Sequence, residues 1–352
     1  MDMKYKTGMY IFLMILLIMV SRIEGSRHSA SAETTRPVKA ASQLRGAPFS
    51  DPAKVFSMTD KWVKQPIKYE QWAEGADLAV ALDQQLYPAI LPLIKKYEKV
   101  NNLKIAVVEG TCGTVAGAAM RKSTDITGMC CPPGLNDRLP GLKYHTLGIA
   151  SVALLVNKDN PVDNISIDEA RKVFMGKILS WSEIKGPTFM KGAGIPLKPV
   201  IRLHCKSRPG HWCLLLANED LFGHRLIEVG TIMDMLAMVA SLKGAIGYET
   251  LWHVTNLKYA GKIKPLKIDG IDPADNDKLA AGLYTIYRTF SITTWQQPDI
   301  SNPNAQKLVQ YILQNLKAID KSYSIVTVDH LKMTGWKFHE DELVGEPSPN
   351  YN

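Results

Sequence analysis

The stretch LKIAVVEGTCGTVAGAAMRK, residues 103–122, decides the fold. Residues 103–108 form an apolar run of strand length, and 109–114 form a turn that contains glycine and hydroxyl side chains. A helix is expected from about 115 to 122. Such a strand, turn and helix bring free backbone N–H groups and the positive end of a helix dipole to one place. The stretch predicts an α/β unit with an anion-binding turn, although many turns of this kind only cap a helix.

The same alternation continues before this stretch. Residues 76–82 predict a buried strand, and 86–100 predict a helix with an apolar face. The apolar positions of that face are Leu86, Ile90, Leu93, Ile94 and Tyr97. Strands that alternate with helices are typical of the α/β class.

The N-terminus has the features of an export signal. Two lysines precede the apolar run 11–20, which is too short to span a bilayer comfortably. Residues 1–32 are therefore predicted to be a cleavable signal peptide and 33–59 a disordered linker, which places the mature protein in the periplasm. An uncleaved membrane anchor is the alternative.

The charge distribution excludes one class of partner. The chain of 352 residues has a formal net charge of +8, and its basic residues are spread out rather than gathered in a stripe. Nucleic-acid binding is therefore not expected. A mild positive balance suits an anionic solute.

Six ordered segments resemble the motifs of phosphate-type periplasmic solute-binding proteins. They are the anion loop 109–114, the strand 123–129, and the later segments 156–161, 167–181, 244–248 and 266–273, followed by 282–284 and Arg288. Six matches in the family's order are hard to obtain by chance. The chain is therefore identified as a member of this family.

The resemblance implies a type II fold, in which two α/β lobes are joined by two crossover strands and hold the ligand in the cleft between them. It assigns 60–151 and 250–336 to the first lobe, 152–249 to the second and 337–352 to a tail. Ligand binding would then close a hinge. The family consists of non-catalytic binders, so neither an enzyme activity nor a cofactor is expected.

The chain departs from the family at the pocket, where relatives present hydroxyl groups. Three segments carry all five cysteines and two histidines: Cys112 in the first loop, Cys130 and Cys131 in the second, and His204, Cys205, His211 and Cys213 in the third. Arg202 survives from the third motif and would balance the charge of an anion or brace the hinge. Gln84, at a further ligand loop of the relatives, is either a polar contact or a plain turn residue.

Cysteines in place of hydroxyl groups predict a soft ligand. Sulfur is a weak hydrogen-bonding group and would hold phosphate badly, whereas thiolates bind thiophilic species. Arsenite fits, because it is an oxyacid of similar size that exchanges hydroxyls for thiolates with loss of water. The chain thus resembles arsenite-binding periplasmic sensor proteins, which pass their signal to a membrane histidine kinase. The expected ligand-binding residues are Cys112, Cys131, Cys205, Cys130, Thr111, Gly113, Thr114, Gln84 and Arg202.

Several other interpretations stay open. Exported cysteines often form disulfides, and Cys205 could pair with Cys213, or Cys112 with Cys130 or Cys131. A Zn²⁺ or Cu⁺ site is another alternative, in which Cys112, Cys130, Cys131, Cys205 and Cys213 with His204 and His211 offer ligands, Cys205, Cys213, His204 and His211 first among them. No C-x-x-C spacing supports it.

Two functional alternatives also remain. An ordinary phosphate-binding component of an ABC transporter would close in the same way and act on an ABC permease. An enzyme with Cys112 as nucleophile would need a partner set that the spacing does not offer.

Overall fold

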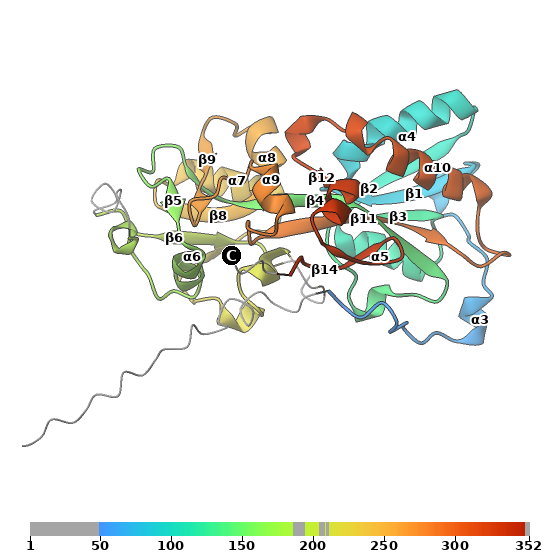
Figure 1. Cartoon of the computed structure of the whole chain (residues 1–352), viewed down its shortest axis with the longest axis horizontal. Coiled ribbons are helices and arrows are strands. Elements are labelled where there is room, and N and C mark those ends of the chain that lie inside the picture. Colours follow the sequence, from blue (N-terminus) through green and yellow to red (C-terminus); the bar gives the residue numbers. More distant parts are fainter. Residues whose placement is uncertain (1–48, 186–193, 204–207, 209–210, 349–352) are drawn as a thin grey trace, which may run out of the picture. The chain divides into compact units, whose positions relative to one another are not determined.

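One large mixed sheet organises the chain. The computed structural model describes residues 49–185, 194–203, 208 and 211–348. In this part of the chain, ten strands form a sheet whose main path is β2-β1-β3-β11-β4-β8-β6-β7, with β9 and β12 also paired to β4 (Figure 1). Its strands are β1 (Leu78–Asp83), β2 (Ile105–Gly110), β3 (Ile126–Met129), β4 (Leu142–Asn157), β6 (Lys198–Ile201), β7 (Ile227–Glu228), β8 (Ala245–Thr250), β9 (Ile263–Pro265), β11 (Tyr287–Trp295) and β12 (Val326–Thr327). The predicted α/β class is confirmed.

Helices and two small ribbons complete the described fold. The helices are α3 (Asp60–Val63), α4 (Tyr87–Asn101), α5 (Cys112–Met120), α6 (Ile167–Phe174), α7 (Ile232–Ser241), α8 (Leu251–Asn256), α9 (Asn276–Ala280), α10 (Pro303–Gln314) and α11 (Val328–Met333). The ribbons pair β5 (Asn164–Ile165) with β10 (Lys267–Ile268), and β13 (Lys337–His339) with β14 (Glu342–Gly345). Among the described helices, none combines the length and the apolar character needed to cross a membrane.

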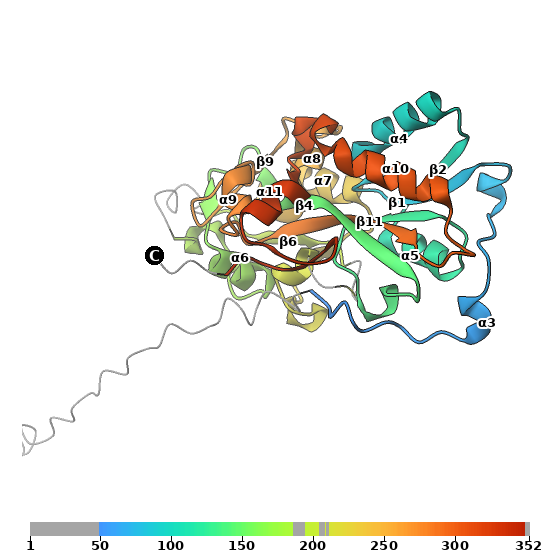
Figure 2. The ribbon, with the colours of Figure 1, turned by 45° about the vertical axis from the view of Figure 1, so that its right-hand side comes forward.

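Strand β1 is buried on both faces because its residues are apolar without a break until Asp83. Leu78, Val80 and Leu82 contact the core that α4 and α10 cover, whereas Ala81 faces the core under α5. Figure 2 shows α4 and α10 together on one side of the sheet and α5 on the other. This two-sided cover explains why the strand reads as a continuous apolar run.

Helix α5 begins earlier than the sequence indicates. The Thr111 hydroxyl accepts a hydrogen bond from the Thr114 N–H at 3.3 Å, so Thr111 is the N-cap and Cys112 opens the helix. The predicted loop residues Cys112, Gly113 and Thr114 therefore form the first helical turn. A helix cap that satisfies one of the otherwise unpaired N–H groups is enough to move the boundary by three residues.

The 16-residue strand β4 connects the two main hydrophobic clusters. Its residues 142–151 pair with β11, and 152–156 pair with β8. Both β4 and β11 contribute side chains to each cluster. The register of the β4–β11 pair shifts between Phe290 and Ser291, opposite Gly148.

The domain boundaries stay a prediction. The predicted signal peptide lies outside the described residues, and so does most of the predicted linker; residues 49–59 contain neither helix nor strand. Part of the predicted tail forms the β13–β14 hairpin, which Glu342 anchors through a buried ion pair with Arg138.

Candidate functional site

Three parallel strands deliver the site residues to one edge of the sheet. In the register of the strands, Asp83 at the end of β1 lies opposite Gly110 of β2, and Leu82 lies opposite Gly128 of β3. The chain reaches Cys112 two residues after Gly110, and Cys130 directly after the last residue of β3. Carboxyl ends of neighbouring parallel strands meet at one edge, so these side chains converge although the sequence separates them.

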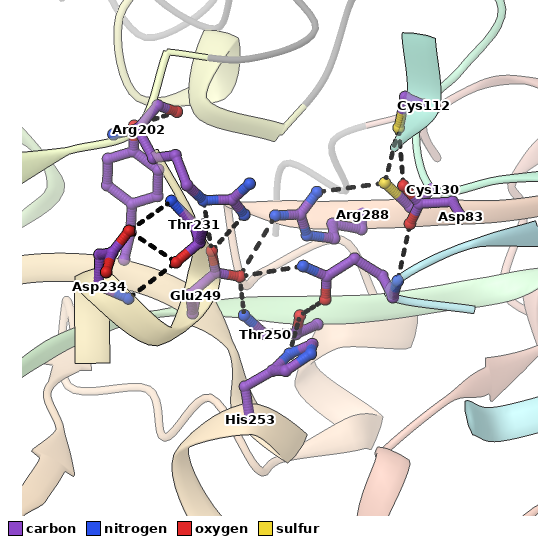
Figure 3. Close-up of polar contacts among 12 residues, drawn as sticks. Asp83, Cys112, Cys130, Arg202, Thr231, Asp234, Glu249, Thr250, His253 and Arg288 are labelled. Atoms are coloured by element: carbon purple, nitrogen blue, oxygen red, sulfur yellow. Dashed lines mark hydrogen bonds and ion pairs between the residues drawn. The ribbon is translucent and has the colours of Figure 1, made fainter. Parts of the chain in front are cut away.

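The three cysteines Cys112, Cys130 and Cys131 form a buried group that we call the thiol cluster. Figure 3 shows two of them, Cys112 and Cys130, beside Asp83 and Arg288. Their sulfur atoms all lie within 4.8 Å of one another. The exposed fractions of the three residues are only 1–2%. The Cys112 and Cys130 sulfurs are 3.3 Å apart, well beyond the roughly 2.05 Å of a disulfide. The Cys112–Cys130 disulfide, one of the pairings that the sequence left open, is therefore not formed in this structure.

Asp83 is part of the same site. The Cys112 thiol donates a hydrogen bond to Asp83 Oδ2 at 3.1 Å, and the Gln85 N–H donates to Oδ1 at 2.8 Å. Burial, and then the charge of Cys130, raise the pKa of the Asp83 carboxyl well above its ordinary value. The carboxyl is a fourth donor group at the edge of the thiol cluster.

Arg288 of β11 connects the thiol cluster to a buried carboxylate. Its Nη1 donates to the Cys130 sulfur at 3.3 Å, and its Nη2 lies 3.5 Å from Glu249 Oε2. Burial and the hydrogen bond with Cys112 raise the pKa of the Cys130 thiol to about 11, although the Arg288 charge acts in the opposite direction. At neutral pH Cys130 is thus a thiol that has a cation beside it.

Glu249 of β8 is held between two arginines. Arg202 Nε donates to Glu249 Oε1 at 3.1 Å, and Gln85 Nε2 donates to Oε2 at 3.1 Å (Figure 3). Burial opposes ionisation, but the charges of Arg202 and Arg288 outweigh it and keep the pKa of Glu249 well below its ordinary range. Glu249 is therefore a buried anion whose charge is matched by its neighbours.

The polar network continues to His253 of α8. The Thr250 hydroxyl donates to Gln85 Oε1 and lies 3.0 Å from His253 Nδ1. Burial lowers the pKa of His253 to about 4, even though Glu249 favours the charged form. His253 is consequently neutral at neutral pH.

The other predicted site residues lie in different settings. Thr111, Gly113 and Thr114 are exposed at the start of α5, where the two hydroxyl oxygens are 3.0 Å apart. Gln84 is half-buried, and its backbone N–H donates to the Gly110 carbonyl. Arg202 forms an ion pair with Glu249. Whether these side chains touch a ligand stays a prediction.

The third predicted segment is described only in part. His204 and Cys205 lie outside the described residues, as does the His211 side chain. Cys213 belongs to a short 3₁₀ helix, η5 (His211–Leu214), where its sulfur lies 3.7 Å from the Arg208 carbonyl. It is packed in the larger hydrophobic cluster and is not one of the three cysteines of the thiol cluster.

Two ion pairs hold the segment that follows Cys131. Asp137 accepts two hydrogen bonds from Arg208, at 2.6 and 2.7 Å, and both side chains are buried. The adjacent Arg138 donates to Glu342 of β14 at 2.7 Å. A cavity of about 230 Å³ opens beside this segment, and Met129, Asp137 and Arg208 are among its lining residues.

Sequence reasoning missed Asp83, Gln85 and Glu249 as site residues. Asp83 carries a usable signal, because a carboxyl that ends an unbroken apolar strand is buried with it. Glu249 carries a weaker one, since it follows the apolar residues of β8. Arg288 appeared only as a motif position, and its contact with Cys130 spans 158 residues of sequence.

Known proteins share this fold and part of this sequence. A family model described as a PBP superfamily domain matches residues 68–315. The phosphate-binding protein PstS of Bacillus subtilis (strain 168) is 27% identical over 266 residues, a match that covers 74% of this chain and 81% of the relative.

Solved structures extend the likeness to the fold. A substrate-binding protein from Clostridium perfringens, solved with bound phosphate, superposes with a TM-score of 0.59 at 16% identity. The match covers 71% of this chain and 99% of that protein. An ABC-type phosphate transport receptor from Vibrio cholerae gives 0.54 at 17% identity, with the same coverage. The predicted two-lobed α/β binding-protein fold is confirmed.

Proposed function

The chain belongs to the PBP superfamily, and from that premise we propose that it is an exported solute-binding protein whose thiol cluster binds a thiophilic oxyacid, arsenite. The observation that carries this proposal is the convergence of three buried sulfurs within 4.8 Å. A binding protein with this arrangement offers its solute thiols rather than hydroxyl groups. Its activity is binding, without catalysis.

The chemistry of the exchange supports the choice of As(III). Arsenous acid, As(OH)₃, is neutral at pH 7, and its reaction with three thiols gives As(SR)₃ and three molecules of water. No electron is transferred, and arsenic stays trivalent. Because the thiols lose their protons to the departing hydroxyls, a thiol such as Cys130, with its pKa raised to about 11, needs no separate base.

The donor groups of the thiol cluster favour an arsenic complex over a free oxyanion. A buried phosphate needs strong hydrogen-bond donors for its oxygens, and thiols are weak donors. The side chains of Arg202 and Arg288 already form ion pairs with Glu249. A thiolate complex of As(III) needs no such donors.

Phosphate is the second candidate solute. It is favoured by the PstS relative and by the two arginines that meet Glu249. The partner follows from the solute: an ABC permease suits phosphate uptake, and a membrane histidine kinase suits arsenite sensing.

Calorimetric titration of the reduced protein tests the proposal. We expect one arsenite to bind per chain and phosphate to bind at least 100-fold more weakly. Cys112→Ser and Cys131→Ser should each weaken arsenite binding at least about tenfold, because each removes one of three sulfurs. Cys205→Ser tests the predicted ligand outside the described residues.

Cys213→Ser is the matched control, since Cys213 is buried but does not belong to the thiol cluster. It should leave arsenite affinity unchanged. Tight phosphate binding without arsenite binding would overturn the arsenite proposal and favour the phosphate transporter. Arsenite binding that survives Cys112→Ser would remove Cys112 from its central role.

A further inference from the structure

We propose that Asp83 completes the thiol cluster into a four-donor site, three sulfurs and one oxygen, that binds a soft divalent cation such as Zn²⁺ or Cd²⁺. The proposal uses the same cysteines as the proposed function but does not depend on arsenite being the solute. It narrows the metal site considered from the sequence to Cys112, Cys130 and Cys131, adds Asp83, and requires neither a histidine nor Cys213.

The geometry of the donors suits one tetrahedral ion. Metal–sulfur and metal–oxygen distances of about 2.3 and 2.0 Å in zinc sites place neighbouring donor atoms roughly 3.5–4 Å apart. The Cys112 sulfur lies 3.3 Å from the Cys130 sulfur and 3.1 Å from Asp83 Oδ2, and the three sulfurs lie within 4.8 Å. To admit an ion at the centre the donors would have to move, the Asp83 carboxyl most of all, because only the three sulfurs form the group of atoms within 4.8 Å of one another.

Regular elements position two of the four donors: Asp83 ends β1 and Cys112 is the first residue of α5. Cys130 and Cys131 follow the last residue of β3 directly. The register of β1 with both neighbouring strands fixes their spacing. Donors on regular elements are held more rigidly than donors on long loops, which favours a preformed site.

The surroundings can accept the charge of such a complex. Three thiolates and one carboxylate around a divalent ion carry a net charge of −2. Arg288 lies 3.3 Å from the Cys130 sulfur, and Arg202 reaches the same network through Glu249. Thiolates are the preferred ligands of soft cations, and burial of the cysteines keeps competing water away.

The dependence on Asp83 distinguishes cation binding from arsenite binding at this site. As(III) forms three bonds and carries a lone pair, so three sulfurs satisfy it without an oxygen donor. A tetrahedral cation needs the fourth donor. Asp83→Asn, which keeps the shape of the side chain, should therefore weaken cation binding much more than arsenite binding.

Cd²⁺ titration of the reduced full-length chain tests this inference. We expect one ion per chain, ultraviolet charge-transfer absorbance that corresponds to three Cd–S bonds, and tetrahedral visible bands when Co²⁺ replaces Cd²⁺. Asp83→Asn should raise the Cd²⁺ Kd at least about tenfold more than it raises the arsenite Kd. Cys213→Ser should change neither value.

The outcomes separate this inference from the proposed function. Arsenite binding without Cd²⁺ binding, or an equal loss of both in Asp83→Asn, would overturn the four-donor site and leave the arsenite proposal standing. Cd²⁺ binding without arsenite binding would overturn the arsenite proposal and leave the four-donor site standing. If Asp83→Asn does not fold, a competition experiment with the unaltered protein replaces it. Arsenite should then abolish the Cd–S absorbance and release one Cd²⁺ ion per arsenic bound. Persistence of the absorbance would contradict a shared site.

Discussion

At the scale of single residues, Glu249 is the charge on which the buried network depends. It is fully buried and ion-paired with Arg202 and Arg288, whereas Glu70 forms an ion pair with Arg121 at 2.9 Å in which both side chains are exposed. Loss of one partner of a buried pair leaves the other charges uncompensated, which is far more costly than loss of an exposed pair.

Glu249→Gln should therefore lower the free energy of unfolding by about 3 kcal/mol, measured by urea denaturation. Glu70→Gln, at the exposed pair, is the matched control and should cost less than about 1 kcal/mol. Equal losses in the two variants would mean that the buried network contributes no more than a surface pair.

His253 makes the stability of the fold depend on pH. Its pKa falls from an ordinary value of 6.5 to about 4 in the fold, so the unfolded chain takes up the proton first. The stability that neutral His253 contributes is present above pH 6.5 and is lost as the pH falls through 4. The charged groups that face it are Glu249, Arg288 and Arg202.

His253→Gln should flatten the dependence of stability on pH between 6.5 and 4, by up to about 1.4 kcal/mol per pH unit. Asp83 contributes with the opposite sign, because its pKa is raised, but this contribution is the same in both proteins and cancels in the difference. Urea titrations at several pH values measure the effect. Parallel curves for the two proteins would contradict it.

At the scale of elements, the N-cap of α5 links helix stability to the site. The Thr111 hydroxyl caps the helix whose first residue is Cys112, and the Ser166 hydroxyl caps α6 in the same way, with N–H to oxygen distances of 3.3 and 3.2 Å. Only the first of these helices carries a thiol of the cluster.

Thr111→Ala and Ser166→Ala should each cost about 1 kcal/mol in stability. Thr111→Ala should also weaken arsenite binding several-fold, because the first turn that holds Cys112 loses its anchor, whereas Ser166→Ala should not. Thermal unfolding and calorimetric titration distinguish the two effects. Unchanged binding in both variants would show that the cap does not position Cys112.

The elements themselves could largely be predicted, but the site could not be predicted in full. The apolar run of β1 and the one-sided pattern of α4 are local signals, and both elements lie within two residues of their expected bounds. The start of α5 was missed because it depends on one side-chain hydrogen bond. Asp83, Glu249 and Arg288 meet only after distant strands pair, and a sequence pattern of short period does not contain that information.

At the scale of the whole molecule, two neighbouring ion pairs have different expected roles. Asp137 belongs to the segment predicted for the first lobe and Arg208 to that predicted for the second, whereas Arg138 and Glu342 join the first lobe to the C-terminal hairpin. Both pairs are buried, so their effects on stability should be similar. Only the Asp137–Arg208 pair would hold a closed cleft.

Arg208→Gln should therefore speed arsenite release at least about tenfold and favour an expanded form in X-ray scattering, since a latch that opens lowers the population of the closed state. Glu342→Gln should lower the melting temperature without a change in release rate. Identical release rates in the two variants would assign the Asp137–Arg208 pair to stability alone.

Burial of the three sulfurs limits how fast a solute can bind to the thiol cluster and leave it. At an exposed fraction of 1–2%, no solute reaches the thiol cluster or leaves it unless the chain opens, so the frequency of opening sets both rates. For a bound solute, occupancy therefore follows the concentration averaged over the residence time rather than the concentration at each moment.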